Sequence, residues 1–217
     1  LGVDYVEFDV RPSMDGEFFL LHDSRLNRTT DGLGPISEMS TAGVRKLSAG
    51  AKFGRPFAPT LVPTMDEFMT ACARKIGFYF DAKQISPAAI AKALEKYQMV
   101  DRTVVYQSPQ FVAQLKAINP RIRGLPPLGK PEEIEELAKL KPYGVDTDWK
   151  ILSKELIDRC HAHGFKVFSD ALDEHEKIED YLKAMEWGID VIQTDYPLRV
   201  MRAIELWADR KKAGGGN

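Results

Sequence analysis

Two carboxylates lie two residues apart inside an otherwise apolar stretch near the start of the chain. The stretch is YVEFDV, residues 5–10, and its acids are Glu7 and Asp9. A β-strand points successive side chains to opposite faces, so a strand here would put both acids on one face. Two buried carboxylates repel one another and are costly to desolvate, and a bound cation removes both penalties. Hard divalent cations such as Ca²⁺ and Mg²⁺ prefer carboxylate oxygens as ligands. The same spacing is also consistent with two exposed acids that pair with Arg11.

A third acid is followed at the same spacing by a lysine. In GFYFDAK, residues 77–83, Asp81 and Lys83 share a face at the C-terminal end of an apolar strand. Barrel enzymes carry their chemistry at that end of their strands. Asp81 could therefore complete a set of metal ligands and Lys83 could bind an anionic group, although a simple ion pair explains the spacing equally well.

His22 is the histidine with the most suggestive position, directly after the apolar stretch FFLL. A lone histidine there is more often structural than catalytic, and the spacing alone leaves both readings open. His161 and His163 lie near a predicted helix C-terminus, where the helix dipole favours them, and His175 lies near a helix start. We interpret these three as structural or surface residues.

Two further residues lie at the ends of predicted strands. Trp149 could stack on a ligand or pack at the rim of the core. Asp195 precedes Pro197 and could cap the last helix or line a pocket.

Alternating strands and helices must position these residues. From residue 77 onward each strand pattern is followed by a helix pattern, which is typical of a parallel sheet. No Gly-rich dinucleotide motif follows a strand, so a TIM-type (β/α)₈ barrel is favoured over a Rossmann-type fold. Barrel strands are predicted at 5–10, 77–83, 103–107, 122–126, 144–149, 166–172 and 190–195, with a further strand at 17–23 beside the first.

Seven barrel strands are one fewer than a closed barrel needs. Leu1 and Gly2 resemble a helix end, so we expect the first barrel strand and helix to precede this chain. We predict one domain over residues 1–211, with a small, mostly irregular insertion around 11–63, and a flexible tail at 212–217.

Composition excludes several classes of protein. The 217 residues are 44% hydrophobic and carry a net charge of −2, which argues against disorder and against a nucleic-acid partner. No run approaches the length of a transmembrane helix. Cys72 and Cys160 match no metal-binding spacing and are interpreted as small core residues. The compartment, cytoplasmic or exported, and the oligomeric state are left open.

Several segments together resemble the glycerophosphodiester phosphodiesterase family. The first 34 residues, LGVDYVEFDVRPSMDGEFFLLHDSRLNRTTDGLG, follow the family pattern nearly position for position. VPTMDEFM resembles a family helix start of the form IPTLEE, FYFDAK its acid-x-Lys strand, GVDTDW a late strand and GIDVIQTDYP its closing strand.

The resemblance implies a (β/α)₈ barrel that hydrolyses glycerophosphodiesters to an alcohol and glycerol 3-phosphate. It implies that Glu7, Asp9 and Asp81 are ligands of a divalent cation, Ca²⁺ or Mg²⁺. It further implies that Lys83 steadies the phosphate and that His22 is one of two catalytic histidines, which we expect to be the general acid.

The chain also departs from the family pattern. Asp81 stands where many members have the longer Glu. The family's His-Arg-Gly and Pro-Glu-Asn-Thr motifs, which supply the second histidine, a phosphate-binding arginine and another acid, do not occur in this chain. FSDAL, which contains Asp170, replaces the Trp-Thr-Val-Asn motif common in the seventh strand.

Three functions are consistent with these observations. The chain could be an active phosphodiesterase, a catalytically impaired barrel that binds a metal or phospho-ligand without turnover, or another metal-dependent barrel such as a sugar-phosphate isomerase.

Overall fold

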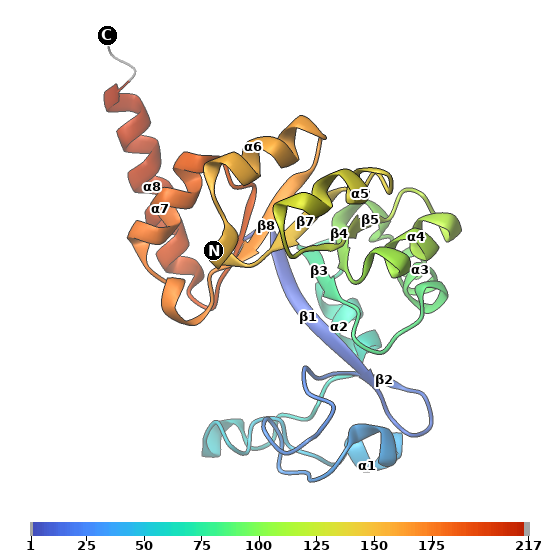
Figure 1. Cartoon of the computed structure of the whole chain (residues 1–217). Coiled ribbons are helices and arrows are strands. Elements are labelled where there is room, and N and C mark those ends of the chain that lie inside the picture. The colour runs from blue at the N-terminus through green and yellow to red at the C-terminus, as the bar shows by residue number, and fades with distance from the viewer. Residues whose placement is uncertain (1, 215–217) are drawn as a thin grey trace. The chain divides into compact units, whose positions relative to one another are not determined.

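Strand β1 carries the first two acids and is the longest strand of the structure. In the computed structural model, which describes residues 2–214, β1 spans Tyr5–Pro12. It pairs in parallel with β3 (Gly77–Asp81) and, at its far end, in antiparallel fashion with β2 (Phe18–Leu20) (Figure 1). The strand predicted beside the first at 17–23 is thus present in shorter form.

The described residues divide into two compact units. The unit called N-terminal below comprises Asp4–Val105 and Gln114–Ile122, and the unit called C-terminal comprises residues 2–3, Tyr106–Ala113 and residues 123–214. The predicted acids, Lys83 and His22 all belong to the N-terminal unit. The prediction of a single domain over residues 1–211 stays a prediction.

The sheet of the N-terminal unit has its strands in the order β2-β1-β3-β4, with β4 at Thr103–Tyr106. Helix α2 begins as the sequence predicts, because Thr64 and Glu67 form a reciprocal capping box. Phe8 on β1 packs against Phe68, with ring centroids 4.5 Å apart, so the apolar face of β1 is buried under α2. The helices with residues in this unit are α1 (Thr41–Val44), α2 (Met65–Cys72), α3 (Pro87–Lys96) and α4 (Pro109–Ile118), and short 3-10 turns lie at Ile36–Glu38, Arg55–Phe57 and Val100–Arg102.

Residues 24–63, which belong to the insertion predicted to be mostly irregular, contain α1 and two of these 3-10 turns. These elements span only three or four residues each, which is too short for a helical period to show in the sequence. A small hydrophobic cluster holds the segment against β2, formed by Phe19, Leu21, Leu26, Ile36, Val44 and Val62.

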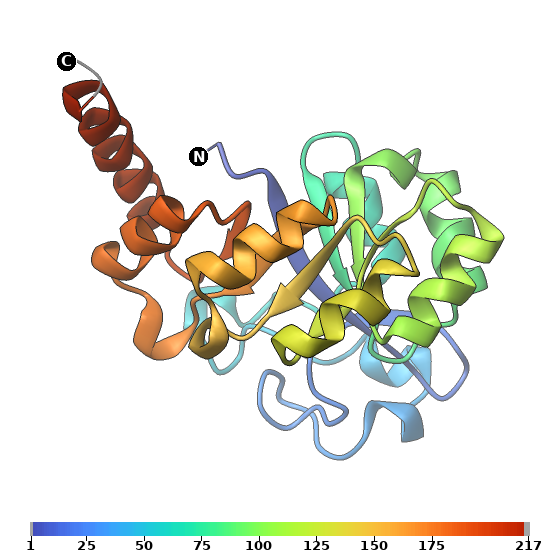
Figure 2. The same ribbon diagram turned by 45° about the horizontal axis from the view of Figure 1, so that its top comes forward.

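Parallel strands β6-β7-β8-β9 form the sheet of the C-terminal unit. Helices α7 and α8 contact one another, and Figure 2 shows them side by side in orange and red. The strands are β5 (Arg123–Leu125), β6 (Pro127–Leu128), β7 (Gly144–Thr147), β8 (Lys166–Asp170) and β9 (Val191–Gln193). The helices are α5 (Ile134–Ala138), α6 (Lys154–Ala162), α7 (Ile178–Trp187) and α8 (Pro197–Gly214), and 3-10 turns lie at Pro131–Glu133, Trp149–Ile151 and Asp173–His175.

The end of the chain and the cysteines bear on smaller predictions. Of the predicted tail at 212–217, α8 includes residues 212–214, and residues 215–217 lie outside the described part of the chain. Cys160 is fully buried, as predicted, and burial raises the pKa of its thiol to about 11. Cys72 is only half-buried. None of the described helices combines the length and apolar character needed to cross a membrane.

A buried glutamate joins three elements of the C-terminal unit. Glu176 is 4% exposed and accepts hydrogen bonds from the hydroxyl of Tyr181 on α7 and from Thr194 Oγ1 at 2.5 Å. Its Oε1 accepts the backbone N–H of Asp195 at 2.8 Å, and its backbone carbonyl accepts a hydrogen bond from Arg199 on α8. Burial, together with the Glu176 carboxylate, raises the pKa of Tyr181 to about 12.

We expect Glu176→Ala to lower the free energy of unfolding by about 3–5 kcal/mol, because it removes the buried carboxylate that accepts hydrogen bonds from two hydroxyls and a backbone amide. Guanidinium unfolding measures this loss. Glu179→Ala, which replaces an exposed glutamate in the first turn of the following helix α7, is the matched control and should change stability by less than about 1 kcal/mol. Equal effects of the two substitutions would contradict a structural role for the network.

Asp190 ties the start of β8 to the start of β9. It accepts hydrogen bonds from the backbone of Val167 at 2.9 Å, from Lys166 Nζ at 2.9 Å and from His161 at 2.8 Å. Burial alone would raise the pKa of Asp190, but these hydrogen bonds and the Lys166 charge outweigh it and lower the pKa below its usual value of 3.8. His161 is thereby a surface partner of a structural carboxylate, as the sequence predicted.

A carboxylate whose pKa is lowered in the folded state stabilises the fold at pH values above its ordinary pKa. This stabilisation is lost as the pH falls through the pKa of the folded state. We therefore expect the stability difference between the native protein and Asp190→Asn to be greatest near neutral pH and to shrink below about pH 4. Urea unfolding of the two proteins at neutral pH and below about pH 4 measures this stability difference. Asp158→Asn, which removes an exposed ion pair with Lys154, is the control, and a difference for Asp190→Asn that is independent of pH would contradict the argument.

Candidate active site

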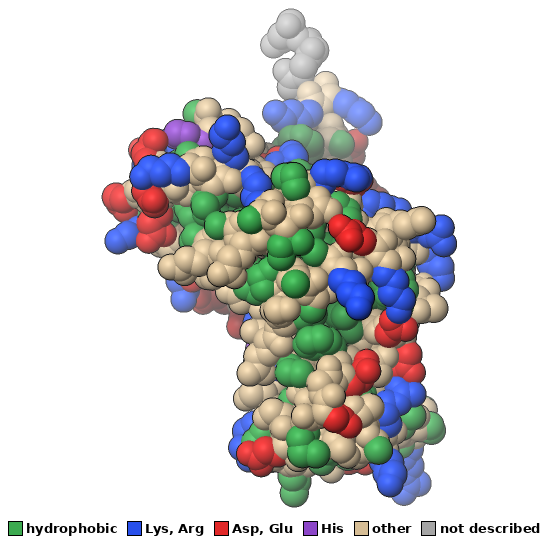
Figure 3. Space-filling model, turned by 90° about the vertical axis from the view of Figure 1, so that its right-hand side faces the viewer, with side chains coloured by type: hydrophobic (Ala, Val, Ile, Leu, Met, Phe, Trp, Pro, Cys, Tyr) green, Lys and Arg blue, Asp and Glu red, His purple; other side chains and the backbone are tan. Residues whose placement is uncertain are grey.

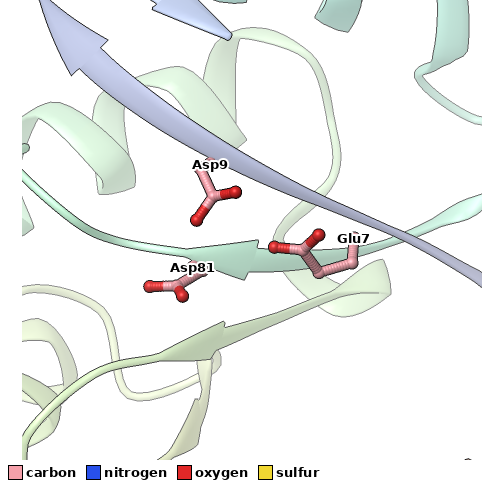
Figure 4. Close-up of side chains that lie close together, drawn as sticks. All are labelled: Glu7, Asp9 and Asp81. Carbon is pink, nitrogen blue, oxygen red and sulfur yellow. The ribbon is translucent and has the colours of Figure 1, made fainter. Parts of the chain in front are cut away.

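Glu7, Asp9 and Asp81 meet because two adjacent strands present them on one face. In the parallel pairing of β1 with β3, Asp9 lies opposite Asp81, and Glu7 lies two residues earlier on β1. One carboxylate oxygen from each acid lies within 4.8 Å of the other two. Figure 4 shows the three carboxylates gathered between the strands. The structure thus brings together the three residues that the sequence predicts as metal ligands.

Two of these acids are largely withdrawn from water. Asp9 is 9% exposed and the side chain of Asp81 is 14% exposed. Burial raises the pKa of Asp81 above its ordinary value, an effect that Lys83 offsets only in part. Carboxylates in this position repel one another unless a cation compensates their charge.

Lys83 supplies part of that compensation. Its Nζ donates a hydrogen bond to Asp81 Oδ2 and lies 3.3 Å from Asp9 Oδ1. Burial alone would lower the pKa of Lys83, but the hydrogen bond to Asp81 and the charges of Asp81 and Asp9 outweigh it and raise the pKa. The ammonium therefore stays charged among the acids.

The Lys83 ammonium does not provide a hydrogen bond to every buried carboxylate oxygen of the site. Asp9 Oδ1 is buried and receives no hydrogen bond within the described chain, since Lys83 lies at ion-pair distance without the geometry of a hydrogen bond. A buried carboxylate oxygen without a donor is unusual in proteins and fits the position of a metal ligand. The all-oxygen set Glu7, Asp9 and Asp81 fits a hard divalent cation such as Mg²⁺ or Ca²⁺.

A cavity of about 340 Å³ opens beside the acids, within the N-terminal unit. This volume lies at the lower end of the range typical of small-molecule sites, roughly 300–1,000 Å³. Glu7 and Asp9 line it, and so does His22, which brings a titratable imidazole to the same space as the acids. The other lining residues are Phe8, Leu20, Leu21, Thr29, Thr30, Ala49 and Val62.

His22 follows β2 and is held from both its backbone and its ring. Arg11 donates two hydrogen bonds to its carbonyl oxygen, at 3.0 and 2.8 Å. Its Nδ1 lies 2.8 Å from Asp23 Oδ1, and Arg28 binds the same carboxylate through Nε at 2.7 Å and Nη2 at 2.9 Å. The hydrogen bonds from Arg28 and then His22 hold the pKa of Asp23 well below its usual range.

Three carboxylates that could hold a cation, together with a lysine and an imidazole in the same region, suit the cleavage of an anionic ester. The cation and the ammonium attract negative charge, and the imidazole can transfer a proton.

Comparison with known proteins identifies the family. A model of the glycerophosphoryl diester phosphodiesterase family matches residues 1–119, more than half of the chain. The chain belongs to this family. Members of this family are phosphoric diester hydrolases, so the enzyme class predicted from the sequence is confirmed.

Relatives in the family match most of the chain. The glycerophosphodiester phosphodiesterase of Caldanaerobacter subterraneus is 27% identical over 208 residues, covering 91% of this chain and 84% of its own. That of Bacillus subtilis is 22% identical over 225 residues, covering 91% and 75%.

Solved structures of the family share the fold. A glycerophosphodiester phosphodiesterase from Agrobacterium tumefaciens superposes with a TM-score of 0.81 at 25% identity, over 92% of this chain and 87% of that one. An Oleispira antarctica phosphodiesterase in complex with the product sn-glycerol-3-phosphate gives 0.83 at 25% identity, over 94% and 86%. The predicted α/β fold class of the TIM-barrel type is thereby confirmed.

Other residues singled out in the sequence lie elsewhere. Trp149 belongs to the C-terminal unit, where it begins a 3-10 turn just after β7 instead of ending the strand. It stacks on His175, with ring centroids 5.8 Å apart, and packs edge-on against Tyr181. A substrate contact for Trp149 stays a prediction. Asp195 is exposed, and its backbone is held by Glu176.

Two functional candidates have no role in the sequence prediction. Asp23 and Arg28 lie in the segment HDSRLNRTT, which contributes to the family resemblance, but neither spacing nor residue type indicates that they contact each other and His22. Only the loop between β2 and the first 3-10 turn brings them together.

Proposed function

We propose that this protein hydrolyses glycerophosphodiesters to an alcohol and glycerol 3-phosphate, using Ca²⁺ or Mg²⁺ held by Glu7, Asp9 and Asp81. The observation that carries the proposal is the convergence of three carboxylates, one of them with a buried oxygen lacking a donor, beside a cavity lined by a histidine. Membership of the family supports the reaction. So does the Oleispira antarctica relative, whose structure contains sn-glycerol-3-phosphate.

The cationic groups account for binding of the phosphodiester and for its activation. When bound, the divalent cation supplies Lewis-acid stabilisation of the phosphoryl oxygens. The Lys83 ammonium, fixed by Asp81 and close to Asp9, adds a preorganised positive charge for the same phosphate. Because Lys83 is held by two acids, it needs no rearrangement as negative charge develops.

His22 accounts for the departure of the alcohol. An alkoxide is a poor leaving group, so protonation of its oxygen lowers the barrier to cleavage. Nδ1 of His22 is engaged by Asp23, whereas Nε2 has no hydrogen-bond partner among the described residues. Nε2 is therefore the nitrogen available to the substrate, and we assign it the role of general acid.

An assay with glycerophosphocholine tests the proposal. We expect release of glycerol 3-phosphate that depends on added Mg²⁺ or Ca²⁺ and stops when EDTA removes the ion. Tight binding of glycerophosphocholine by titration calorimetry without product would instead support the second function, a barrel that binds without turnover. Isomerisation of a sugar phosphate without diester cleavage would support the third.

A further inference from the structure

Asp23 and Arg28 form a clamp behind His22. The Asp23 carboxylate accepts two hydrogen bonds from the planar fork of Arg28, at 2.7 and 2.9 Å, and a third contact from His22 Nδ1 at 2.8 Å. Bidentate arginine–carboxylate pairs are more rigid than single contacts because the two parallel bonds fix the orientation of both groups. The carboxylate is therefore held in one orientation with respect to the imidazole.

The charge of Asp23 decides which ring nitrogen carries the proton. The hydrogen bonds from Arg28 and His22 keep the pKa of Asp23 well below its usual range, so its oxygens are ionised and can only accept hydrogen bonds. A 2.8 Å contact from His22 Nδ1 is then a hydrogen bond only if Nδ1 carries hydrogen. Neutral His22 must accordingly have its lone pair on Nε2, and protonated His22 must carry its transferable hydrogen there.

We propose that Asp23, clamped by Arg28, is a positioning residue that fixes the Nδ1–H tautomer of His22 and reserves Nε2 for proton transfer to the leaving group. This inference rests on the proposed function for the role of Nε2, but the tautomer itself does not. In the reaction the Nε2–H proton passes to the departing alkoxide oxygen while the Nδ1–H proton stays between His22 and Asp23.

The rest of the surroundings agree with a positioning role. Arg11 holds the backbone carbonyl of His22, so the residue is fixed at two places while its side chain stays 62% exposed. Because an exposed imidazole would otherwise rotate and exchange tautomers freely, the Asp23 contact supplies an orientation that packing does not.

Nitrogen-15 NMR of the histidine rings tests the tautomer without any assay of activity. His22 signals are assigned by their loss in His22→Ala. In the native protein at a pH where His22 is neutral, we expect the hydrogen-bearing signal at Nδ1 and the lone-pair signal at Nε2. In Asp23→Asn we expect a mixture of tautomers, because an amide can donate as well as accept. A native His22 with its hydrogen on Nε2 would overturn the proposal.

Kinetics test the consequence. We expect Asp23→Asn to lower kcat by about 100-fold or more with KM changed less than about threefold, because Asp23 orients the imidazole without touching substrate. Arg28→Lys should lower kcat by a smaller factor, since lysine keeps the charge but not the fork. Cation affinity, measured by calorimetry with Mg²⁺, should stay unchanged in both variants.

Asp101→Asn is the matched control, because Asp101 forms the same two-pronged pair with Arg121 but has no histidine beside it. It should leave kcat unchanged. A native kcat in Asp23→Asn would overturn the proposal. If the native protein shows no hydrolysis, the proposed function fails, and the NMR result still decides whether Asp23 fixes the tautomer.

Discussion

Replacing Asp9 with asparagine should lower kcat/KM for a glycerophosphodiester by about 10³-fold, because it removes a charge from the proposed ligands of the cation that would stabilise the phosphoryl oxygens. Asp9 is the most buried of the three acids, and its Oδ1 receives no hydrogen bond from the described residues. Asparagine keeps the shape but halves the number of ligand oxygens and adds two N–H donors. The substitution also removes one of the two acidic partners of Lys83 Nζ.

The cause of the loss can be separated from damage to the fold. If Asp9 acts as a ligand, Mg²⁺ or Ca²⁺ should bind more weakly in calorimetry, and high concentrations of the ion should restore part of the activity. Asp4→Asn, the same change of charge at an exposed position just before β1, is the matched control and should leave both properties intact. A tenfold loss or less in Asp9→Asn, or a loss with native cation affinity, would contradict the assignment.

The proposed metal ligands could be predicted from the sequence to different degrees. Glu7 and Asp9 lie on one strand, and the alternation of side chains alone put them on one face. Asp81 lies more than 70 residues further along the chain, and only strand pairing brings it opposite Asp9. No local pattern encodes that register, so the resemblance to a family was needed to join the three.

The residues proposed to position His22, namely Asp23 and Arg28, were still harder to predict from the sequence. The contact between Asp23 and Arg28 depends on the path of a loop that has no periodicity, and the short helical elements after it leave no helical signature. Trp149 is a case in which the sequence left two interpretations open. Its position at a predicted strand end allowed either a ligand contact or packing at the rim of the core. β7 ends two residues earlier and the ring packs on His175 and Tyr181, while the substrate contact stays a prediction.

The surface carries charges of both signs. On the face drawn in Figure 3, acidic and basic side chains are interspersed, in keeping with a net charge of −2 over 217 residues. Charge is instead concentrated in the site, where three acids and one lysine lie together, and it is the local balance there that determines ligand chemistry.

His22→Ala should lower kcat for glycerophosphocholine by about 10³-fold, within the range expected for loss of a general acid. The size of the loss should depend on the alcohol that leaves. Choline leaves as a strongly basic alkoxide that needs a proton, whereas p-nitrophenolate leaves without one. If His22 Nε2 protonates the leaving group, a p-nitrophenyl phosphodiester should be cleaved by His22→Ala at a rate within about tenfold of the native enzyme.

This comparison distinguishes the two roles that an imidazole in the cavity could have. A histidine that activates the attacking water would be needed for both substrates, so both rates would fall together. His163→Ala removes an exposed histidine that pairs with Glu135, and it controls for loss of an imidazole without loss of the site. Equal losses on the two substrates would reassign His22 from acid to base, and native activity on both would remove it from the reaction, leaving the three carboxylates and Lys83 to bind the phosphodiester alone.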